Sequence, residues 1–239
     1  MKILITGSKG FIGKNLTAEL NNIKESKAKG YNLNPDLTLF EYDIDTDPSL
    51  LDGYCKNADF VFHLAGVNRP KDQTEFMEGN FGFTSVLLDT LKKHGNNCPV
   101  MLSSSIQAEL DNPYGVSKKA GEDLLFHYGK EVGADVLIYR FPNVFGKWCR
   151  PNYNSAVATF CNNIANDLPI QVNNRSANMT LVYIDDVVKE LISALEGKPN
   201  RVGEFCMVPV EHKITLGEIV DLIYSFKESR GSLQVVDLN

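Results

Sequence analysis

The sequence predicts an α/β fold built on a doubly wound parallel sheet. Short apolar runs alternate with stretches whose apolar residues recur at helical spacing, and the connections between them are short. The length of 239 residues, with 43% apolar residues, suits one domain of ordinary size with a sizeable core. Helices that join successive strands in this way form right-handed crossovers, so neighbouring strands should run parallel.

The first half of the chain alternates regularly. Expected strands are short runs rich in Ile, Leu, Val or Phe, and a short helix should begin near Pro48. The strands are expected at 3–5, 37–42, 59–66, 100–102 (running into serines 103–105) and 135–139, and the longer helices at 11–23, 74–94 and 113–132.

The second half is less regular. Helices are expected over 156–166, 186–195 and 214–226. The last is introduced by Thr215, with Glu218 three residues later, which is the pattern of a capping box. Residues 229–239 are expected to be either an end added to the natural chain or a strand without its neighbours.

Composition argues against several functions. The net charge of −6, without a basic stripe, argues against nucleic-acid binding. No apolar run is long enough to span a membrane, and a strand that begins at once leaves no room for a signal peptide, so a cytoplasmic location is expected. We expect reduced thiols and no metal site, because the histidines are scattered and no C-x-x-C spacing occurs among Cys55, Cys98, Cys149, Cys161 and Cys206.

Three glycines at a spacing of three stand between the first strand and the first helix. One glycine permits a sharp turn, one lets the backbone approach a pyrophosphate, and one lets the helix pack close to the strand. The helix start then presents N–H groups and its positive dipole end to the phosphates. The alternative is a glycine-rich turn without a ligand. We expect a dinucleotide site made by Gly7, Lys9, Gly10, Phe11, Ile12 and Gly13.

Tyr114 and Lys118 lie four residues apart on an expected helix, which puts the phenol and the ammonium on one face. A phenol titrates near 10 in water, and a nearby cation favours the phenolate and lowers that pKa. The pair follows a strand that ends in three serines. We interpret the pair as an acid–base site rather than as an ordinary surface pair.

These motifs resemble the extended short-chain dehydrogenase/reductase family. The resemblance is carried by TGSKGFIG, FVFHLAG, a helix with Asn80 near its start, a strand ending SSS, YGVSK, RFPNVFG and the stretch 181–187, and covers residues 1 to about 226. It implies a Rossmann-like, NADP(H)-binding domain over 1–228, with a small C-terminal substrate lobe from segments near 143–182 and 203–226. More narrowly, the chain resembles the reductase half of bifunctional capsular polysaccharide enzymes, whose C-terminal cupin domain is absent from this chain.

The resemblance implies NADPH-dependent reduction of the C4 keto group of a UDP-4-keto-6-deoxy-N-acetylhexosamine, on the route to UDP-N-acetyl-L-fucosamine. The C3 epimerisation would belong to the cupin domain. Tyr114 would be the general acid, and Lys118 would tune it and hold the nicotinamide ribose. A serine would steady the carbonyl oxygen. Ser105 is preferred and Ser104 is the alternative, because three consecutive serines leave the register open. The family usually has some twenty-odd residues between this hydroxyl and the tyrosine, whereas Ser105 precedes Tyr114 by only nine (114 − 105), a departure from the family pattern.

Other positions follow from the same resemblance. Leu64, Ala65 and Gly66 would pass beneath the cofactor, although close packing explains them equally well. Relatives often dimerise through a helix pair, so a homodimer is expected. Candidate substrate contacts are polar residues that have plainer interpretations as a helix cap, a turn asparagine or surface arginines: Asn80, Asn143, Arg69, Arg150 and Arg175. Met179 stands where the family often has arginine, and Arg175 could substitute for it.

The sequence gives conflicting indications for NAD and for NADP(H). Glu41 and Asp43 could bind the adenosine ribose hydroxyls, which favours NAD. Asp43 and Ile44 also resemble the pair that meets the adenine edge, and Lys9 could meet a 2′-phosphate. We expect NADP(H).

The alternative activities would require different residues at the site. A 4,6-dehydratase would need carboxylates at Ile106 and Gln107, and a single-site epimerase–reductase would need Cys or His there. The remaining alternatives are an NAD-dependent nucleotide-sugar 4-epimerase, which would reuse the tyrosine, and a non-catalytic dinucleotide sensor.

Overall fold

The computed structural model describes residues 1–232 and divides into two compact units. The first unit comprises residues 1–142 and 184–209. The second comprises residues 143–183 and the chain from residue 210 onwards. Residues 203–209, expected in the substrate lobe, lie in the first unit because β9 pairs with β5.

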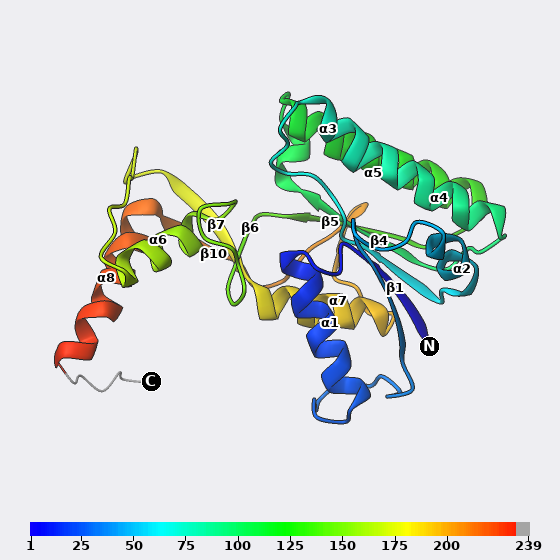
Figure 1. The fold of residues 1–239 in the computed structure, drawn as a ribbon, viewed down its shortest axis with the longest axis horizontal. Coiled ribbons are helices and arrows are strands. Elements are labelled where there is room, and N and C mark those ends of the chain that lie inside the picture. The colour runs from blue at the N-terminus through cyan, green and yellow to red at the C-terminus, as the bar shows by residue number, and fades with distance from the viewer. Residues whose placement is uncertain (233–239) are drawn as a thin grey trace. The chain divides into compact units, whose positions relative to one another are not determined.

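A seven-stranded sheet forms the centre of the first unit, in the order β2-β1-β3-β4-β5-β9-β8. Its strands β1, β4 and β5 are labelled in Figure 1. Neighbouring strands pair in parallel from β2 through β9, and β8 pairs antiparallel with β9. The strands are β1 (Lys2–Thr6), β2 (Thr38–Tyr42), β3 (Phe60–His63), β4 (Val100–Ser105), β5 (Val136–Phe141), β8 (Arg201–Val202) and β9 (Phe205–Cys206). The predicted doubly wound, mostly parallel sheet is confirmed.

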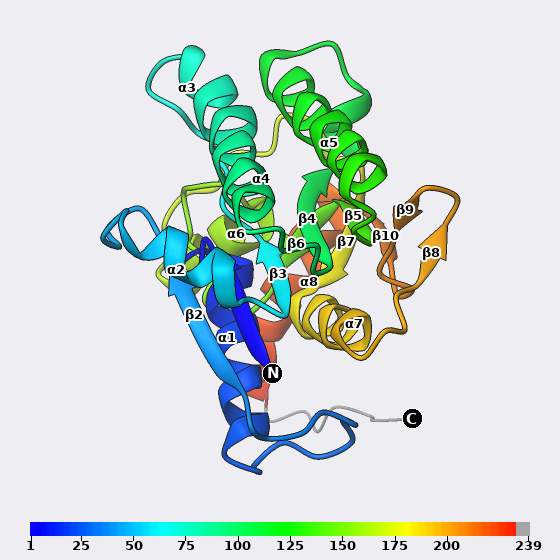
Figure 2. The same cartoon turned by 90° about the vertical axis from the view of Figure 1, so that its right-hand side faces the viewer.

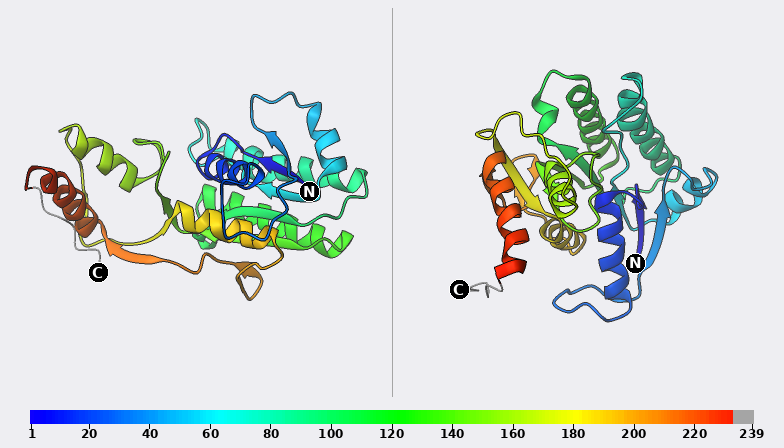
Figure 3. Two further views of the ribbon diagram at one scale, coloured as in Figure 1. Left: turned by 90° about the horizontal axis from the view of Figure 1, so that it is seen from below. Right: turned by 60° about the vertical axis from the view of Figure 1, so that its left-hand side comes forward.

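Helices cover both faces of this sheet (Figure 2). α1 (Phe11–Lys24) and α7 (Ile184–Leu195) pack together on one face (Figure 3). α2 (Leu50–Asn57), α4 (Phe83–Lys93) and α5 (Pro113–Val132) share an apolar core with the other face. Because both faces are covered, the central strands are apolar almost throughout; all four residues of β3 are buried.

The helix expected over 74–94 forms, with a wider turn inside it. α3 (Thr74–Met77) continues through a π-helical turn, η1 (Glu78–Gly82), into α4. Wider turns of this kind are frequent at functional sites. This one contains the buried residue Asn80.

The second unit has its own three-stranded sheet, in the order β10-β7-β6. β6 (Asn143–Phe145) pairs parallel with β7 (Asn178–Tyr183), and β10 (His212–Thr215) pairs antiparallel with β7. α6 (Ala156–Ala165) and α8 (Leu216–Ser232) pack against each other beside this sheet (Figure 3). Their shared core contains Phe160, Ile164, Leu181, Ile219 and Val220.

The start of α8 shows one confirmed prediction and two corrections. Glu218 N donates to Thr215 Oγ1 at 3.2 Å, and Thr215 N donates to Glu218 Oε2 at 2.8 Å, so the capping box is confirmed. The prediction of helix from residue 214 is wrong, because Ile214 and Thr215 pair with β7. α8 also runs to Ser232, past the expected start of the tail at 229; residues 233–239 lie outside the described part of the chain.

Candidate active site

The glycine turn joins β1 to α1 by two very close approaches. Gly7 has a φ of +70°, and a Cβ added to it would lie 2.6 Å from Ala65 N. A Cβ added to Gly13 would lie 2.1 Å from Gly7 O. Both spacings are too short for a side chain, so the turn packs directly on the segment after β3, and α1 packs directly on the turn.

Features of this turn fit a pyrophosphate. α1 follows Gly10, which is extended, and no side chain caps the helix. The first N–H groups of an uncapped helix lack partners within the helix and point toward an anion, as expected for Phe11 and Ile12. Ser8 Oγ is buried without a hydrogen-bond partner among the described residues. These groups could hold the phosphates of a dinucleotide.

The position expected to meet a 2′-phosphate is rich in carboxylates. Lys9 N donates to Asp43 Oδ2 at 2.8 Å, and the Lys9 ammonium forms an exposed ion pair with Asp45. The hydrogen bond with Asp45 raises the pKa of Lys9, and the charges of Asp43 and Glu41 act in the same direction. The Ile44 side chain is fully exposed.

Three successive turns of α5 contact the three serines that end β4. Tyr114 is hydrogen-bonded to Ser105. Lys118 Nζ donates to the Ser103 carbonyl at 3.0 Å, and Ser104 Oγ donates to Glu122 Oε1 at 2.5 Å. Ser105 is therefore the serine at the phenol, while the Ser104 hydroxyl is buried against Glu122.

Burial sets the protonation of the tyrosine–lysine pair. It raises the pKa of Tyr114, while the hydrogen bond with Ser105 acts in the opposite direction. The expected lowering of the Tyr114 pKa by Lys118 is contradicted: Nζ lies 5.9 Å from the centre of the phenol ring and is directed to Ser103. Burial lowers the pKa of Lys118 to about 8, and Glu122 opposes this shift. A protonated phenol beside an ammonium can supply a proton at neutral pH.

Asn80 anchors the segment that follows β3. Its Oδ1 accepts from Val67 N at 2.9 Å, and its Nδ2 donates to Val67 O and to Ser117 Oγ, each at 2.9 Å. Ser117 Oγ donates in turn to Tyr114 O at 2.7 Å. Both amide protons are used within the protein and no cap is formed, so the structure favours an anchoring role over the expected substrate contact.

The segment 64–66 lies between the glycine turn and the tyrosine–lysine pair. Ala65 contacts Gly7, as described above. A Cβ added to Gly66 would lie 3.0 Å from Lys118 Nζ and 2.8 Å from Asn80 Oδ1. The expected cofactor residues Leu64, Ala65 and Gly66 therefore connect the two halves of the candidate site.

Sequence reasoning missed two buried groups here. His63 bonds Thr6 Oγ1 at 2.7 Å and Thr84 Oγ1 at 2.8 Å, and burial lowers its pKa to about 3. Glu122 receives the Ser104 hydroxyl. A signal existed for Glu122, since it follows Lys118 by four residues on the same helix face. His63 reads only as one residue of an apolar strand.

The other expected substrate residues are dispersed. Arg69 is exposed in the first unit. Asn143, Arg150 and Arg175 belong to the second unit. Asn143 Nδ2 donates to Thr180 O at 3.2 Å, and Arg150 lies 5.5 Å from the Tyr153 ring centre. Arg175 Nη2 donates to both carboxylate oxygens of Asp221 at 2.7 Å, so a diphosphate at Arg175 would compete with that carboxylate.

A family model described as "NAD dependent epimerase/dehydratase family" matches residues 3–204. The chain belongs to this family. The glycine turn and the tyrosine–lysine pair thus lie within the matched region, and the resemblance to extended short-chain dehydrogenases/reductases is confirmed.

Among individual relatives, UDP-2-acetamido-2,6-beta-L-arabino-hexul-4-ose reductase of Pseudomonas aeruginosa is 46% identical over 98% of this chain. The crystal structure of the capsular polysaccharide assembling protein CapF from Staphylococcus aureus aligns with all of this chain at 48% identity and a TM-score of 0.86. The chain spans 59% of the length of the reductase and 62% of the CapF chain. A UDP-glucuronic acid 4-epimerase from Bacillus cereus, at 22% identity and a TM-score of 0.79, shares the fold.

Three further observations concern residues 1–232. Within them, no helix combines the length and apolar character needed to traverse a bilayer. The same residues contain no group of three or more His, Cys, Asp or Glu side chains placed to hold a metal ion. All five cysteines are free thiols.

Proposed function

We propose that this chain catalyses the NADPH-dependent reduction of the C4 keto group of a UDP-4-keto-6-deoxy-N-acetylhexosamine, in the synthesis of a capsular polysaccharide precursor, UDP-N-acetyl-L-fucosamine. The observation that carries the proposal is the contact of Tyr114 and Lys118 with the serine end of β4, joined to the glycine turn through residues 64–66. The name of the 46% identical relative, a reductase of a UDP-linked hexul-4-ose, supports the substrate class.

Each residue of the pair has a defined task in this proposal. The bound cofactor supplies the hydride. Tyr114 gives its proton to the C4 oxygen, and burial keeps the phenol protonated until that step. Because an ammonium has three donors, Lys118 can bind a ribose hydroxyl while keeping its bond to Ser103.

Ser105 completes the group that faces the carbonyl. Its hydroxyl accepts from Gln107 N at 3.2 Å and is bonded to Tyr114. A hydroxyl held in this way can donate to the oxygen as negative charge develops there. The Ser104 hydroxyl lacks this freedom because it is committed to Glu122.

Cofactor and assembly belong to the same proposal. The glycine turn would bind the pyrophosphate, and Lys9 would bind the 2′-phosphate of NADP(H), with Asp43 and Ile44 near the adenine. Asn143, Arg150, Arg175 and Arg69 would contact the UDP-sugar. The resemblance implies a homodimer, and the composition favours a cytoplasmic location.

An NAD-dependent nucleotide-sugar 4-epimerase is the second candidate. The observation in its favour is that three carboxylates, those of Glu41, Asp43 and Asp45, surround Lys9. Such a group of acids suits ribose hydroxyls better than a phosphate. A non-catalytic sensor is disfavoured by the retained tyrosine–lysine pair.

The test combines the purified chain with NADPH or NADH and a UDP-4-keto-6-deoxy-N-acetylhexosamine, with the reduced nicotinamide followed by absorbance. Stoichiometric oxidation with formation of the C4 alcohol supports the reductase. Tightly retained NAD with sugar interconversion would instead identify the epimerase, and cofactor binding without turnover would identify the sensor.

A further inference from the structure

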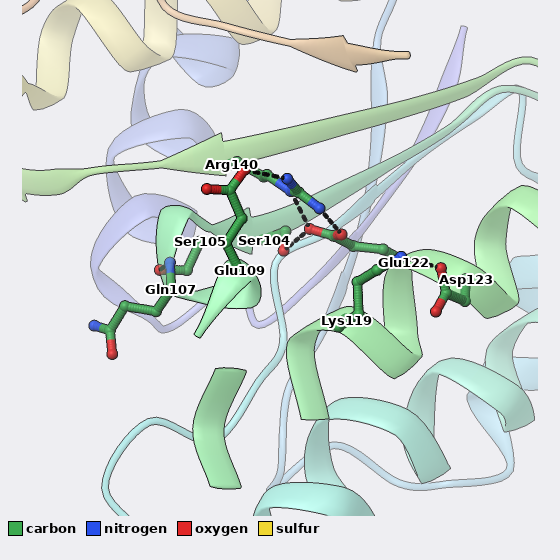
Figure 4. A network of polar contacts seen from close by, with 8 residues as sticks. All are labelled: Ser104, Ser105, Gln107, Glu109, Lys119, Glu122, Asp123 and Arg140. Atoms are coloured by element: carbon green, nitrogen blue, oxygen red, sulfur yellow. Dashed lines mark hydrogen bonds and ion pairs between the residues drawn. The ribbon is translucent and has the colours of Figure 1, made fainter. Parts of the chain in front are cut away.

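A buried carboxylate outside the proposed chemistry lies beneath the candidate site. Glu122, on α5, is 0% exposed. Its Oε1 accepts from Ser104 Oγ at 2.5 Å and from Arg140 Nε at 2.9 Å, and its Oε2 accepts from Arg140 Nη2 at 2.7 Å (Figure 4). Burial of a carboxylate is costly unless it is paired and hydrogen-bonded, and these three bonds meet that requirement.

Arg140 extends this network to two more elements. Its guanidinium carbon lies 3.8 Å from the ring centre of Phe205, on β9. Its Nη1 donates to Glu109 Oε1 at 2.9 Å (Figure 4). Glu109 ends η2 (Ile106–Glu109), the short helix that follows Ser105. Glu122 therefore holds the serine end directly, and through Arg140 it holds the short connection between Ser105 and Tyr114.

The titratable groups that face Lys118 come from two elements. On α5 these are Tyr114 and Glu122, one helical turn to either side. On β3 it is His63, which burial keeps neutral. Among the described residues, Glu122 is the acidic group whose charge opposes the loss of the Lys118 proton.

We propose that Glu122 is a positioning residue of this site: it keeps the serine end of β4 in register with Tyr114 and Lys118, and its charge keeps the buried Lys118 side chain protonated. The catalytic meaning of that protonation rests on the proposed reductase function, whereas the contacts themselves do not.

The same helix offers a matched control. Asp123, the next residue, pairs with Lys119 at the surface, where both side chains are exposed (Figure 4). Asp123→Asn and Glu122→Gln make the same chemical change on neighbouring positions. Only Glu122 contacts the strand and faces Lys118.

The test follows Lys118 itself, by NMR titration of the lysine Cε resonances in the protein without cofactor or substrate. The Lys118 signal is assigned through its loss in Lys118→Met. Glu122→Gln is expected to move the Lys118 midpoint to lower pH by about one unit, and Asp123→Asn to leave it in place. A folded Glu122→Gln protein with the wild-type midpoint would overturn the proposal.

Glu122→Gln leaves the Arg140 charge without its buried partner, so a second variant guards against loss of the fold. The double variant Glu122→Gln, Arg140→Gln is compared with Arg140→Gln alone, because loss of the Arg140 cation by itself raises the Lys118 midpoint. Relative to Arg140→Gln, the double variant is expected to show the downward movement of the Lys118 midpoint. An unchanged midpoint there also overturns the proposal. Because the titration needs neither cofactor nor substrate, its failure is distinct from a failure to oxidise NADPH.

Discussion

Lys118 donates a hydrogen bond from Nζ to the Ser103 carbonyl at 3.0 Å, and this bond ties the helix of the proposed acid to the strand that ends in serines. The ammonium is buried, and burial lowers its pKa to about 8. The position of Lys118 is thus set by the protein alone. Its charge, by contrast, depends on pH within a range that enzymes commonly experience.

Activity should therefore fall as the pH rises past about 8. Below its pKa Lys118 is charged, and above it the site loses the cation that would bind the ribose. The alkaline limb of kcat/KM reports the free enzyme, so its midpoint should lie near 8, with about tenfold loss per pH unit beyond it. Lys118→Arg, whose guanidinium stays charged, should weaken activity and abolish this limb. A limb at the same pH in that variant would assign the titration to another group.

Replacement of the phenol separates chemistry from binding. Tyr114→Phe keeps the ring but removes the proton donor, so reduction should drop by about 10²- to 10⁴-fold. NADPH should still bind, since the glycine turn is untouched, and fluorescence titration of the cofactor measures this. Turnover at the wild-type rate in the variant would remove Tyr114 from its role.

The two neighbouring serines should respond differently to alanine. Ser105→Ala removes the hydroxyl at Tyr114 and should lower kcat by about 10- to 10³-fold with little change in thermal stability. Ser104→Ala removes one of the bonds to buried Glu122 and should cost about 1–3 kcal/mol of unfolding free energy, measured by denaturant titration. The reverse pattern, with the larger loss of kcat in Ser104→Ala, would assign the carbonyl contact to Ser104.

Most of the first unit could be predicted because its signals are local. The strands around Ile3 and Phe62 are apolar runs. In the second unit, the capping box at Thr215 is a local signal too, because it is read from two residues. The second sheet could not be predicted, since β6 has three residues and β10 has four, too few to show a period.

The remaining features of the site depend on tertiary contacts, which the sequence alone does not show. Three consecutive serines leave the register open in sequence, and the sheet resolves it by pairing Ser104 with Arg140 and Ser105 with Phe141. The bond between Glu122 and Arg140 joins a helix to a strand 18 residues on, which no local pattern contains. The pKa of Tyr114 was predicted in the wrong direction because burial, a tertiary property, raises it and outweighs the hydrogen bond with Ser105.

Cofactor preference should depend on the ion pair at the glycine turn. Lys9→Ala is expected to weaken NADPH binding about tenfold and NADH binding much less, because only NADPH carries the 2′-phosphate that Lys9 would meet. Asp45→Asn should act in the opposite direction, since it releases the Lys9 ammonium and removes a carboxylate that repels the phosphate. Lys24→Ala, at the far end of α1, is the control and should change neither affinity. Fluorescence titrations with both cofactors measure these effects.

Equal losses for NADPH and NADH in Lys9→Ala would remove Lys9 from cofactor selection. Tighter wild-type binding of NADH would replace NADP(H) by NAD in the proposal.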